Sequence, residues 1–568
     1  MKLELSEKRQ AILSQAGHVL VLGGPGSGKT TIALLKAQCR CALLLPGQEV
    51  LFLSFSRAAI RQVVLRCKEL LAPPERRLIT VRTYHAFCLE LLQAHGRLLH
   101  GAAVNILYPG DERLQKAEFA GDWEAERRRL ASTESMFCFD LFAAGVAELL
   151  ERCAALRDLI GDRYPMIIVD EFQDTGNDQW RIVQALATVA EVFCLADPEQ
   201  RIFDYRADVD PRRLDILRER IELNEFDLGA ENHRSPNSGI LRFADAVLKN
   251  KGPLPNTPDI KQVGYWNNGF AATAHAGVMW TFSSLRKSGV EDPCVAVLAR
   301  SNAFVAELSG ILAERHTYNG HVLNPIDHDV LWDAELSAAA GIVVATILEW
   351  STDMPAVGVA RTLQAIASYY KLKNAERPTK AAAENARKFD MSALSVAQGG
   401  KPKIKAATKL LAAYGTIPQP VGDPVVDWRE ARHVLNEIDV LNELFREARL
   451  VRLFRATDAL ATGLASRWLD TGTYAGASGL VKRTLDQERL IAAERDPHGC
   501  ILMNMHKAKG KEFDGVVLVE GAFRSEFFDE RTEKPPYESS RRLLRVALTR
   551  ARRLVTIIRP RNARPLVD

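Results

Sequence analysis

The chain has 568 residues, of which 47% are hydrophobic and 26% are charged, and its formal net charge is +4 at pH 7. This composition is typical of an ordinary soluble globular protein, and the small net charge means that any nucleic-acid site is local. The N-terminal sequence has no apolar signal core and no run of 18 apolar residues occurs, so we expect no membrane segment. Nine scattered cysteines without a CxxC pair favour reduced thiols and a cytoplasmic location over disulfides or a zinc site.

Short apolar runs bounded by polar turns alternate with helical stretches along the chain. The expected buried strands are Val19–Leu22, Val50–Phe55, Met166–Val169, Glu191–Ala196, Cys294–Ala299 and Gly515–Glu520. A helical pattern covers Leu141–Leu159, and residues 330–490 are rich in Ala and Leu and mostly helical. At roughly 150 residues per domain, the length suggests about four domains or subdomains. The alternation predicts an α/β protein with parallel sheets, in which two cores surround an inserted helical domain.

The first expected strand leads into the glycine-rich sequence GGPGSGKT at 23–30, and an apolar helical pattern follows it. This is the strand–loop–helix context of a phosphate-binding loop, G-x4-G-K-[ST]. Glycines let the backbone wrap a triphosphate, while loop N–H groups and the helix N-terminus favour negative charge. We expect Lys29 to reach the β- and γ-phosphates of ATP and Thr30 to bind Mg²⁺. The expected nucleotide-binding residues of this loop are Gly24, Pro25, Gly26, Ser27, Gly28, Lys29, Thr30 and Thr31.

A second part of the same site is expected in YPMIIVDEFQDT at 164–175. An apolar strand delivers Asp170 and Glu171 at its C-terminal end, where α/β sheets place their sites. Asp170 is suited to hold Mg²⁺ through water, and Glu171 is suited to orient and deprotonate an attacking water. Together with the glycine-rich loop, this pair predicts hydrolysis of a nucleoside triphosphate rather than kinase chemistry.

These two sequences resemble motifs I and II of the UvrD/Rep-type superfamily 1 helicases, and other motifs follow in the family's order. They are RQAIL at 9–13 (Q motif), FSRAA at 55–59 (Ia), TYHAF at 83–87 (Ib), ADPEQRIFDYRAD at 196–208 (III), NHRSP at 232–236 (IV), NMHKAKGKEFD at 504–514 (V) and RRLLRVALTRA at 541–551 (VI). The resemblance implies two RecA-like P-loop cores with parallel sheets and inserted, mainly helical accessory subdomains.

The domain boundaries expected on this plan interrupt each core once. The first core comprises residues 1–88 and 136–230, with a short accessory insert at 89–135. The second core comprises residues 231–329 and 491–568, with a helical accessory insert at 330–490.

The resemblance also implies how ATP hydrolysis is sensed. Gln200 matches the position that contacts the γ-phosphate from the first core, and Arg234 and Arg550 match two arginines that reach it from the second. Two guanidinium groups would act as an arginine finger supplied in cis, because they neutralise the charge that spreads over the transferred phosphoryl group. The expected catalytic residues are therefore Lys29, Asp170, Glu171, Gln200, Arg234 and Arg550.

Four further residues match nucleotide contacts of the family. Gln10 resembles the residue that reads adenine, although its register is off by one and Arg9 is the rival. Glu512 matches a contact to the ribose, and Gly510 lets the backbone approach. His233 stands where the family usually has a tyrosine stacked on adenine, and an imidazole stacks over less area.

The nucleic-acid side of the motif set uses different chemistry. Thr83 and His85 match a loop that touches the backbone of the strand, and Tyr205 and Arg206 match an aromatic–arginine pair along its path. A tyrosine can stack on any base, so this contact is independent of sequence. For Phe55, packing in the core is an equally good interpretation. The expected nucleic-acid-binding residues are Phe55, Thr83, His85, Tyr205, Arg206, His506 and Lys509.

Several positions depart from the usual family pattern. Arg545 stands where a tyrosine is usual, Lys511 where a leucine is common, and Asn504 replaces a usual threonine. The first accessory insert is also shorter than usual. Because accessory domains hold the duplex, the short insert favours translocation on a single strand over strand separation.

The leading hypothesis is an ATP-dependent DNA translocase or helicase that moves 3′→5′ on single-stranded or partly duplex DNA. The alternative is an ATPase subunit that senses nucleotide and DNA and controls a partner nuclease, loosely similar to the helicase subunits of Gabija-type anti-phage systems. DNA repair is the standard role of longer relatives. An inactive scaffold is disfavoured because the catalytic residues are all present.

Overall fold

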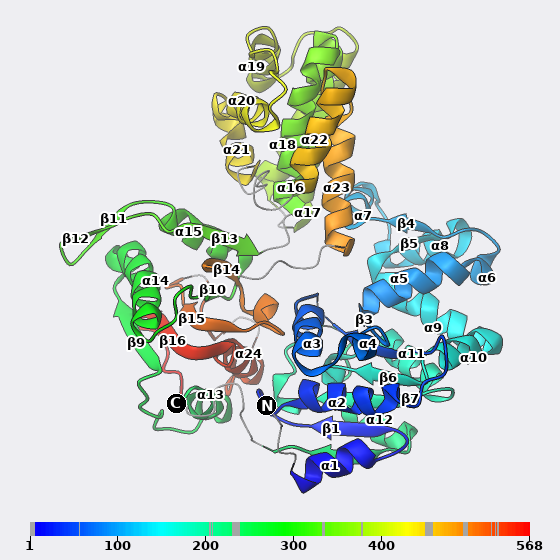
Figure 1. Cartoon of the computed structure of the whole chain (residues 1–568). Coiled ribbons are helices and arrows are strands. Elements are labelled where there is room, and N and C mark those ends of the chain that lie inside the picture. The colour runs from blue at the N-terminus through cyan, green and yellow to red at the C-terminus, as the bar shows by residue number, and fades with distance from the viewer. Residues whose placement is uncertain are drawn as a thin grey trace. The chain divides into compact units, whose positions relative to one another are not determined.

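The structure is a computed structural model that describes residues 6–55, 57–203, 206, 208–229, 239–331, 335–376, 379–448, 458–491, 498–523, 525–528, 530 and 533–568. The chain forms two compact units (Figure 1). The first unit is made of Met1–Ala102, Phe142–Trp332 and Ala493–Asp568, and the second of Ala103–Leu141 and Asp333–Ala492. The chain therefore leaves the first unit twice and returns to it twice. The four-part domain division remains a prediction.

In its described part, the first unit contains two six-stranded sheets. The first has the order β3-β2-β6-β7-β1-β8, and its strands are parallel. Its strands are β1 (Val19–Leu22), β2 (Val50–Ser54), β3 (Ile79–Thr83), β6 (Met166–Val169), β7 (Glu191–Ala196) and β8 (Asn224–Asp227). Because all strands run the same way, the carboxyl ends of β1, β7 and β6 meet at one edge of the sheet.

Helices cover the first sheet because its central strands are apolar on both faces. Val21, Phe52 and Ile168 pack with α1 (Glu7–Ser14), α2 (Lys29–Cys41) and α3 (Arg57–Leu70). The alternate residues Leu20 and Leu51 are also fully buried, on the opposite face. The further helices around this sheet are α4 (Pro73–Arg76), α5 (Tyr84–His95), α6 (Arg97–His100), α9 (Phe142–Arg152), α10 (Ala154–Arg163), α11 (Asn177–Ala187) and α12 (Arg213–Arg220).

The helix expected at Leu141–Leu159 is wrong as a single element. The structure has two helices, α9 and α10, separated by Cys153. Cys153 has extended backbone (φ −118°, ψ 93°), so the helical hydrogen-bond pattern cannot run through it. The expected strands fare better: β1, β6 and β7 have the expected bounds, whereas β2 ends one residue earlier than expected.

The second sheet has the order β13-β14-β10-β15-β16-β9 and is also parallel. Its strands are β9 (Ile260–Tyr265), β10 (Val295–Ala299), β13 (His328–Leu331), β14 (Cys500–Asn504), β15 (Phe513–Val519) and β16 (Ala551–Pro560). The helices α13 (Ile240–Lys249) and α24 (Glu538–Leu548) pack on one face, and α14 (Phe270–Lys287) and α15 (Asn302–Leu312) on the other. The predicted α/β class with parallel sheets is confirmed, and the two sheets are consistent with two RecA-like cores.

The second unit is helical, as expected for residues 330–490. Its helices are α7 (Pro109–Glu118), α8 (Trp123–Glu134), α16 (Glu335–Leu348), α17 (Pro355–Glu376), α18 (Lys380–Ala397), α19 (Lys405–Tyr414), α20 (Pro424–Asn436), α21 (Asn442–Ala448), α22 (Asp458–Thr471) and α23 (Ala477–Ile491). One apolar core joins α16 to α23. The segment 103–141 also carries the short strands β4 (Asn105–Leu107) and β5 (Met136–Cys138), and it contacts the helical segment through an ion pair between Asp111 and Lys482.

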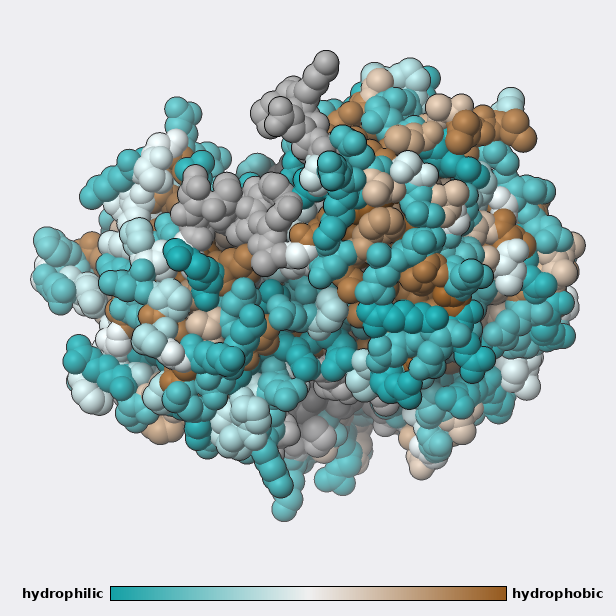
Figure 2. Space-filling model, turned by 90° about the horizontal axis from the view of Figure 1, so that it is seen from below, coloured by the Kyte–Doolittle hydropathy of each residue, from teal (hydrophilic) through white to brown (hydrophobic). Residues whose placement is uncertain are grey.

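The surface is largely hydrophilic where it can be seen. Figure 2 shows one face of the molecule, on which hydrophilic residues predominate and hydrophobic residues form smaller patches. The buried hydrophobic side chains are instead gathered in the clusters of the sheets and of the helical unit. Among the described helices, none is long and apolar enough to cross a membrane.

Arg541 is the largest side chain that is almost completely buried in the second core, with 1% exposure. It donates hydrogen bonds to the backbone carbonyls of Pro536 (2.7 Å), Val247 (2.9 Å) and Leu566 (2.6 Å). One guanidinium group therefore ties α24, α13 and the C-terminal segment together.

We predict that Arg541→Leu lowers the free energy of unfolding by about 2–4 kcal/mol, because three buried carbonyls lose their donor. Thermal unfolding of the purified variant measures this effect. The matched control is Arg542→Leu on the same helix, whose guanidinium pairs with the exposed Glu538 at 3.2 Å. Equal melting temperatures for the two variants would contradict the prediction.

Candidate nucleotide site

The glycine-rich loop connects β1 to α2 at the carboxyl edge of the first sheet. The N–H of Gly23 donates to the carbonyl of Ala196 (3.2 Å) at the end of β7, which fixes the start of the loop. A Cβ atom on Gly23 would lie 2.5 Å from Oγ of Ser27, so only glycine fits this close approach. Gly28 has φ of +86° at the N-terminus of α2, a conformation that glycine adopts without strain. The sequence pattern therefore has a direct steric cause.

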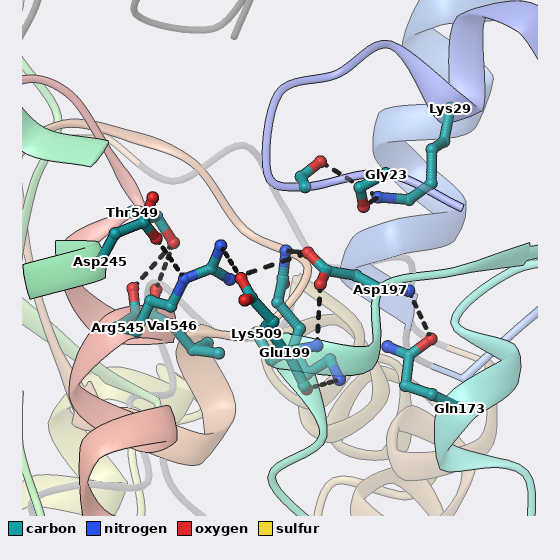
Figure 3. Close-up of polar contacts among 12 residues, drawn as sticks. Gly23, Lys29, Gln173, Asp197, Glu199, Asp245, Lys509, Arg545, Val546 and Thr549 are labelled. Atoms are coloured by element: carbon teal, nitrogen blue, oxygen red, sulfur yellow. Dashed lines mark hydrogen bonds and ion pairs between the residues drawn. The ribbon is translucent and has the colours of Figure 1, made fainter. Parts of the chain in front are cut away.

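The side chain of Lys29 folds back onto the backbone of the glycine-rich loop. Nζ of Lys29 donates to the carbonyls of Gly23 (2.5 Å) and Gly24 (3.1 Å) (Figure 3). Thr30 and Thr31 are half-buried in the first turn of α2. An ammonium group, a helix N-terminus and two hydroxyl groups thus lie at one end of β1.

The structure places the two rivals for the adenine-reading position differently. Arg9 is buried, and its Nη2 donates to the carbonyl of Ser27 at 3.0 Å. Gln10 is exposed on α1. Arg9 therefore stabilises the glycine-rich loop through a hydrogen bond to its backbone. The adenine contact of Gln10 remains a prediction.

The acidic pair lies directly after β6. Asp170 is buried, and its carboxylate accepts hydrogen bonds from the N–H of Glu171 (3.0 Å) and Oγ of Ser54 (3.5 Å). Glu171 has φ of +55°, an unusual conformation for a residue other than glycine. Nε2 of Gln173 donates to the Glu171 carboxylate at 2.6 Å. Backbone conformation and hydrogen bonds therefore fix where both carboxylates lie.

The two carboxylates have opposite pKa shifts. Burial, and next the negative charge of Glu171, raises the pKa of Asp170 to about 7. Burial also disfavours ionised Glu171, but the positive charges of Lys509, Lys29 and Arg550 outweigh it and hold the pKa of Glu171 below its usual range. An ionised Glu171 can accept a proton, which is the chemistry of a general base.

The donor set fits a hard divalent cation. Asp170 and Thr30 supply oxygen atoms, which Mg²⁺ prefers, and a cation would favour the ionised form of Asp170. Among the described residues, no group of three or more His, Cys, Asp or Glu side chains could hold a metal by itself. Mg²⁺ bound here would therefore take its remaining ligands from phosphate oxygens and water, as is usual for this ion.

Gln200 lies in a short 3-10 turn after β7, and its side chain is held at both ends. Its Nε2 donates to Oδ2 of Asp197 (2.8 Å), and its Oε1 accepts from Nη2 of Arg550 (3.1 Å). Gln200 and Arg550 are both buried, at 4% and 2% exposure. The structure thus brings together two of the predicted catalytic residues from segments associated with different sheets.

Lys509 is buried between acidic side chains of the first sheet. Its ammonium group pairs with Asp174 and with Glu171 (3.3 Å) and donates to the carbonyl of Gln200 (2.7 Å). Burial disfavours the charged form, but Asp174 and Glu171 outweigh this and raise the pKa of Lys509. The motif resemblance predicts that Lys509 lies at the nucleic acid and the interdomain cleft. In this structure its ammonium group pairs with Asp174 and Glu171, and the nucleic-acid contact remains a prediction.

The comparisons with known proteins follow the motif pattern. Residues 5–135 and 113–211 match the UvrD/REP helicase N-terminal domain, and residues 499–558 match the UvrD-like helicase C-terminal domain. The chain carries both domains of the UvrD-type helicase family. The predicted resemblance is therefore confirmed.

Named relatives are similar to this chain over part of its length. The ATP-dependent DNA helicase PcrA of Staphylococcus aureus strain Mu50 is 22% identical over 356 residues, which are 52% of this chain and 48% of the relative. PcrA of Staphylococcus epidermidis is 24% identical over 296 residues, 43% of this chain and 40% of the relative. The chain thus spans about half the length, or less, of these relatives.

Gly510 and Glu512 are the described residues among the remaining expected nucleotide contacts. Gly510 has φ of +76° and follows Lys509 directly. Glu512 pairs with Arg552 at 3.2 Å, so its carboxylate already has a cationic partner. His233 and Arg234 lie outside the described residues, and their roles in the nucleotide site remain predictions.

The predicted nucleic-acid residues lie at several loop positions of the UvrD-type cores. The Thr83 hydroxyl accepts the N–H of Ala86 (3.1 Å) and so caps α5, which leaves His85 exposed in the first turn. Phe55 is half-buried, with its ring centroid 5.2 Å from that of Tyr84, as either interpretation allows. The DNA contacts of Phe55, Thr83 and His85 remain predictions.

Arg206 and His506 are two further residues expected at the nucleic acid, and the structure gives them different charge states. Arg206 is exposed and pairs with Asp208 at 2.7 Å, while its neighbour Tyr205 lies outside the described residues. Burial, and next the charge of Arg300, lowers the pKa of His506 to about 4. His506 is therefore neutral near pH 7, and any contact that it makes with a phosphate would be a neutral hydrogen bond.

Sequence reasoning missed residues that complete the site. Gln173, Asp174 and Asp197 join the catalytic residues through hydrogen bonds, with Asp197 N–H donating to Oε1 of Gln173 at 3.0 Å. All three lie inside motifs II and III. Their position directly after buried strands β6 and β7 was the signal that could have found them.

We predict that Lys509→Met lowers the free energy of unfolding of the first unit by about 3–5 kcal/mol, because the buried Asp174 loses its ammonium partner. The double variant Lys509→Met/Asp174→Asn should recover part of the loss, since Asp174 no longer carries a charge while Glu171 keeps the nearby charges of Lys29 and Arg550. Urea unfolding of the three proteins gives both values. A single variant as stable as the parent protein would show that the ion pair does not matter for folding.

Proposed function

We propose that this chain is an ATP-driven DNA translocase that couples hydrolysis between its two sheets to movement along a single strand. The observation that carries the proposal is the Gln200 side chain, which is held between Asp197 of the first sheet and Arg550 next to the second. A group that contacts both sides can respond to the γ-phosphate and transmit the change. The 3′→5′ direction rests on the resemblance to the helicase family alone.

The residues of the chain divide the hydrolysis step among them. Lys29 and the N-terminus of α2 supply positive charge for the phosphates. Thr30 and Asp170 would hold Mg²⁺, which neutralises phosphate charge when bound. Glu171 accepts the proton of the attacking water. Arg550 stabilises charge on the transferred phosphoryl group, which lowers the barrier without tightening ground-state binding.

The DNA substrate, a role in DNA repair and a cytoplasmic location belong to the same proposal. They rest on the named relatives, on the motif set and on the cysteine pattern. The proposed strand contacts follow motif order: Phe55, Thr83, His85, Tyr205, Arg206, His506 and Lys509.

A second candidate function is an ATPase subunit that controls a partner nuclease in anti-phage defence and unwinds little by itself. The observation behind it is the small first insert, since residues 103–141 add α7, α8, a 3-10 turn at Phe139–Leu141 and two three-residue strands to the second unit. A strand-displacement assay beside a translocation assay separates the candidates. Translocation with strand displacement favours the helicase, and DNA-stimulated hydrolysis without either supports the regulatory subunit.

We predict that Lys29→Ala abolishes ATP hydrolysis with and without single-stranded DNA and leaves the melting temperature unchanged. The ammonium group acts on phosphate charge, and its hydrogen bonds to the described residues go to the carbonyls of Gly23 and Gly24. A steady-state phosphate-release assay measures the loss. The control is Lys68→Ala, which removes an exposed lysine of α3. Normal turnover by the Lys29 variant would overturn the role of the loop.

We predict that Glu171→Gln keeps binding of ATP and single-stranded DNA but lowers the hydrolysis rate by about 10²–10⁴-fold, the usual contribution of a general base. An amide keeps the shape of the carboxylate and can still accept the hydrogen bond from Gln173, yet it cannot take a proton. Single-turnover hydrolysis and fluorescent-nucleotide binding on one preparation test this. Hydrolysis at the parent rate would mean that the base lies elsewhere.

A further inference from the structure

The guanidinium group of Arg545 faces three carboxylates at the boundary of the two sheets. Its Nε lies 2.8 Å from Oδ1 of Asp245, its Nη2 lies 2.7 Å from Oε2 of Glu199, and its Nη1 lies 3.8 Å from Oδ2 of Asp197 (Figure 3). Arg545 itself is 2% exposed. Asp245 belongs to α13, beside the second sheet, whereas the other two carboxylates follow β7 of the first. The buried guanidinium group of Arg545 thus contacts segments that belong to both sheets.

Asp197 connects this cation to the catalytic glutamine. Oδ2 of Asp197 accepts the hydrogen bond from Nε2 of Gln200 at 2.8 Å, and it is the same oxygen that faces Nη1 of Arg545. Oδ1 of Asp197 accepts the N–H of Glu199 at 3.0 Å. Asp197 is 3% exposed, so its charge needs a nearby cation. Arg545 supplies that cation, 3.8 Å from the oxygen that accepts from Gln200.

The contact between Arg545 and Asp197 is incomplete in this structure. Within the described part of the chain, Nη1 of Arg545 is buried and has no hydrogen-bond partner. The distance from Nη1 to Oδ2 of Asp197 is 3.8 Å, whereas a hydrogen bond between nitrogen and oxygen is about 2.9 Å long. A shift of α24 of about 1 Å would complete the bond and change what Oδ2 offers to Gln200.

We propose that Arg545 is a positioning residue that couples the position of α24 to the orientation of Gln200. Through Asp197 it fixes the Gln200 amide, so that Oε1 faces Arg550, which lies just beyond the C-terminus of the same helix. The proposal rests on the proposed ATPase function. It gives the departure from the usual tyrosine a role, since a phenol ring carries no charge with which to hold Asp197.

Arg545→Met leaves the buried Asp197 without this cation and should lower the melting temperature. The double variant Arg545→Met/Asp197→Asn removes both charges and should recover part of that loss, so kcat is compared per folded molecule. The pair with Glu199 contributes little, because the Glu199 side chain is 47% exposed. Arg545→Met keeps the length of the side chain without its charge, and Arg545→Lys keeps a charge without the forked geometry.

The test compares Arg545→Met, Arg545→Lys, Asp197→Asn and the double variant Arg545→Met/Asp197→Asn, with Arg542→Met on the same helix as control. We expect Arg545→Met to lower kcat for ATP by about tenfold while KM changes less than about threefold, because the loss falls on the transition state. Arg545→Lys should regain part of kcat. The double variant should lose no more than the worse single variant, since both act through one contact.

A readout without catalysis accompanies the kinetics. Hydrogen exchange of the amides of Asp197, Glu199 and Gln200, measured without nucleotide, should rise about tenfold in Arg545→Met and stay unchanged in the control, because the turn around Asp197 loses its anchor. Parent kcat or unchanged exchange in Arg545→Met would overturn the proposal. So would a fall in melting temperature that accounts for the lost activity, together with additive effects in the double variant. If the parent protein lacks ATPase activity, the proposed function fails, and hydrogen exchange alone decides the role of Arg545.

Discussion

The candidate site depends on the burial of several carboxylates at one edge of the first sheet. Asp170 and Glu171 are adjacent, and Asp174 and Asp197 lie close by, so ionising all of them requires cations. Lys509 supplies one against Asp174 and Glu171, and burial still raises the pKa of Asp170 to about 7. The site is therefore built to attract further positive charge. A divalent cation with its phosphate ligands would satisfy that demand, which gives the acidic edge a reason beyond its hydrogen bonds.

Lys29 belongs to the first sheet, but three further cations at this edge come from segments of the second sheet. Lys509 follows β14, while Arg545 and Arg550 lie in and just after α24. The electrostatic balance of the site thus depends on both sheets, and a shift of either changes the pKa of Glu171 and the hydrogen bonds of Gln200. Under the proposed function, this arrangement makes chemistry and domain movement parts of one equilibrium.

The parts of the fold that sequence could predict are those with a simple physical signature. The strands β1, β6 and β7 are continuous apolar runs, because they lie inside a sheet covered on both faces. The edge strand β8 was missed because its residues, Asn224–Asp227, are largely exposed and polar. The edge strand β9 is partly buried and mixes polar with apolar residues, so it lacks a continuous apolar run. The glycine-rich loop and the acidic pair were found because steric and chemical demands restrict their residue types. No such pattern shows which way a long side chain points, so the burial of Lys509 could not be foreseen.

The same reasoning explains why Arg545 could be noticed in the sequence but not understood from it. A cation in place of an aromatic ring is stable in a buried position only where carboxylates surround it. Those carboxylates, Asp197, Glu199 and Asp245, are distant from Arg545 in sequence, and two of them belong to a motif with its own catalytic residue. The arginine at this position is therefore explained only together with the three carboxylates that it contacts. Because that set includes the acceptor for Gln200, a residue beside the site in sequence becomes part of how the two sheets act together.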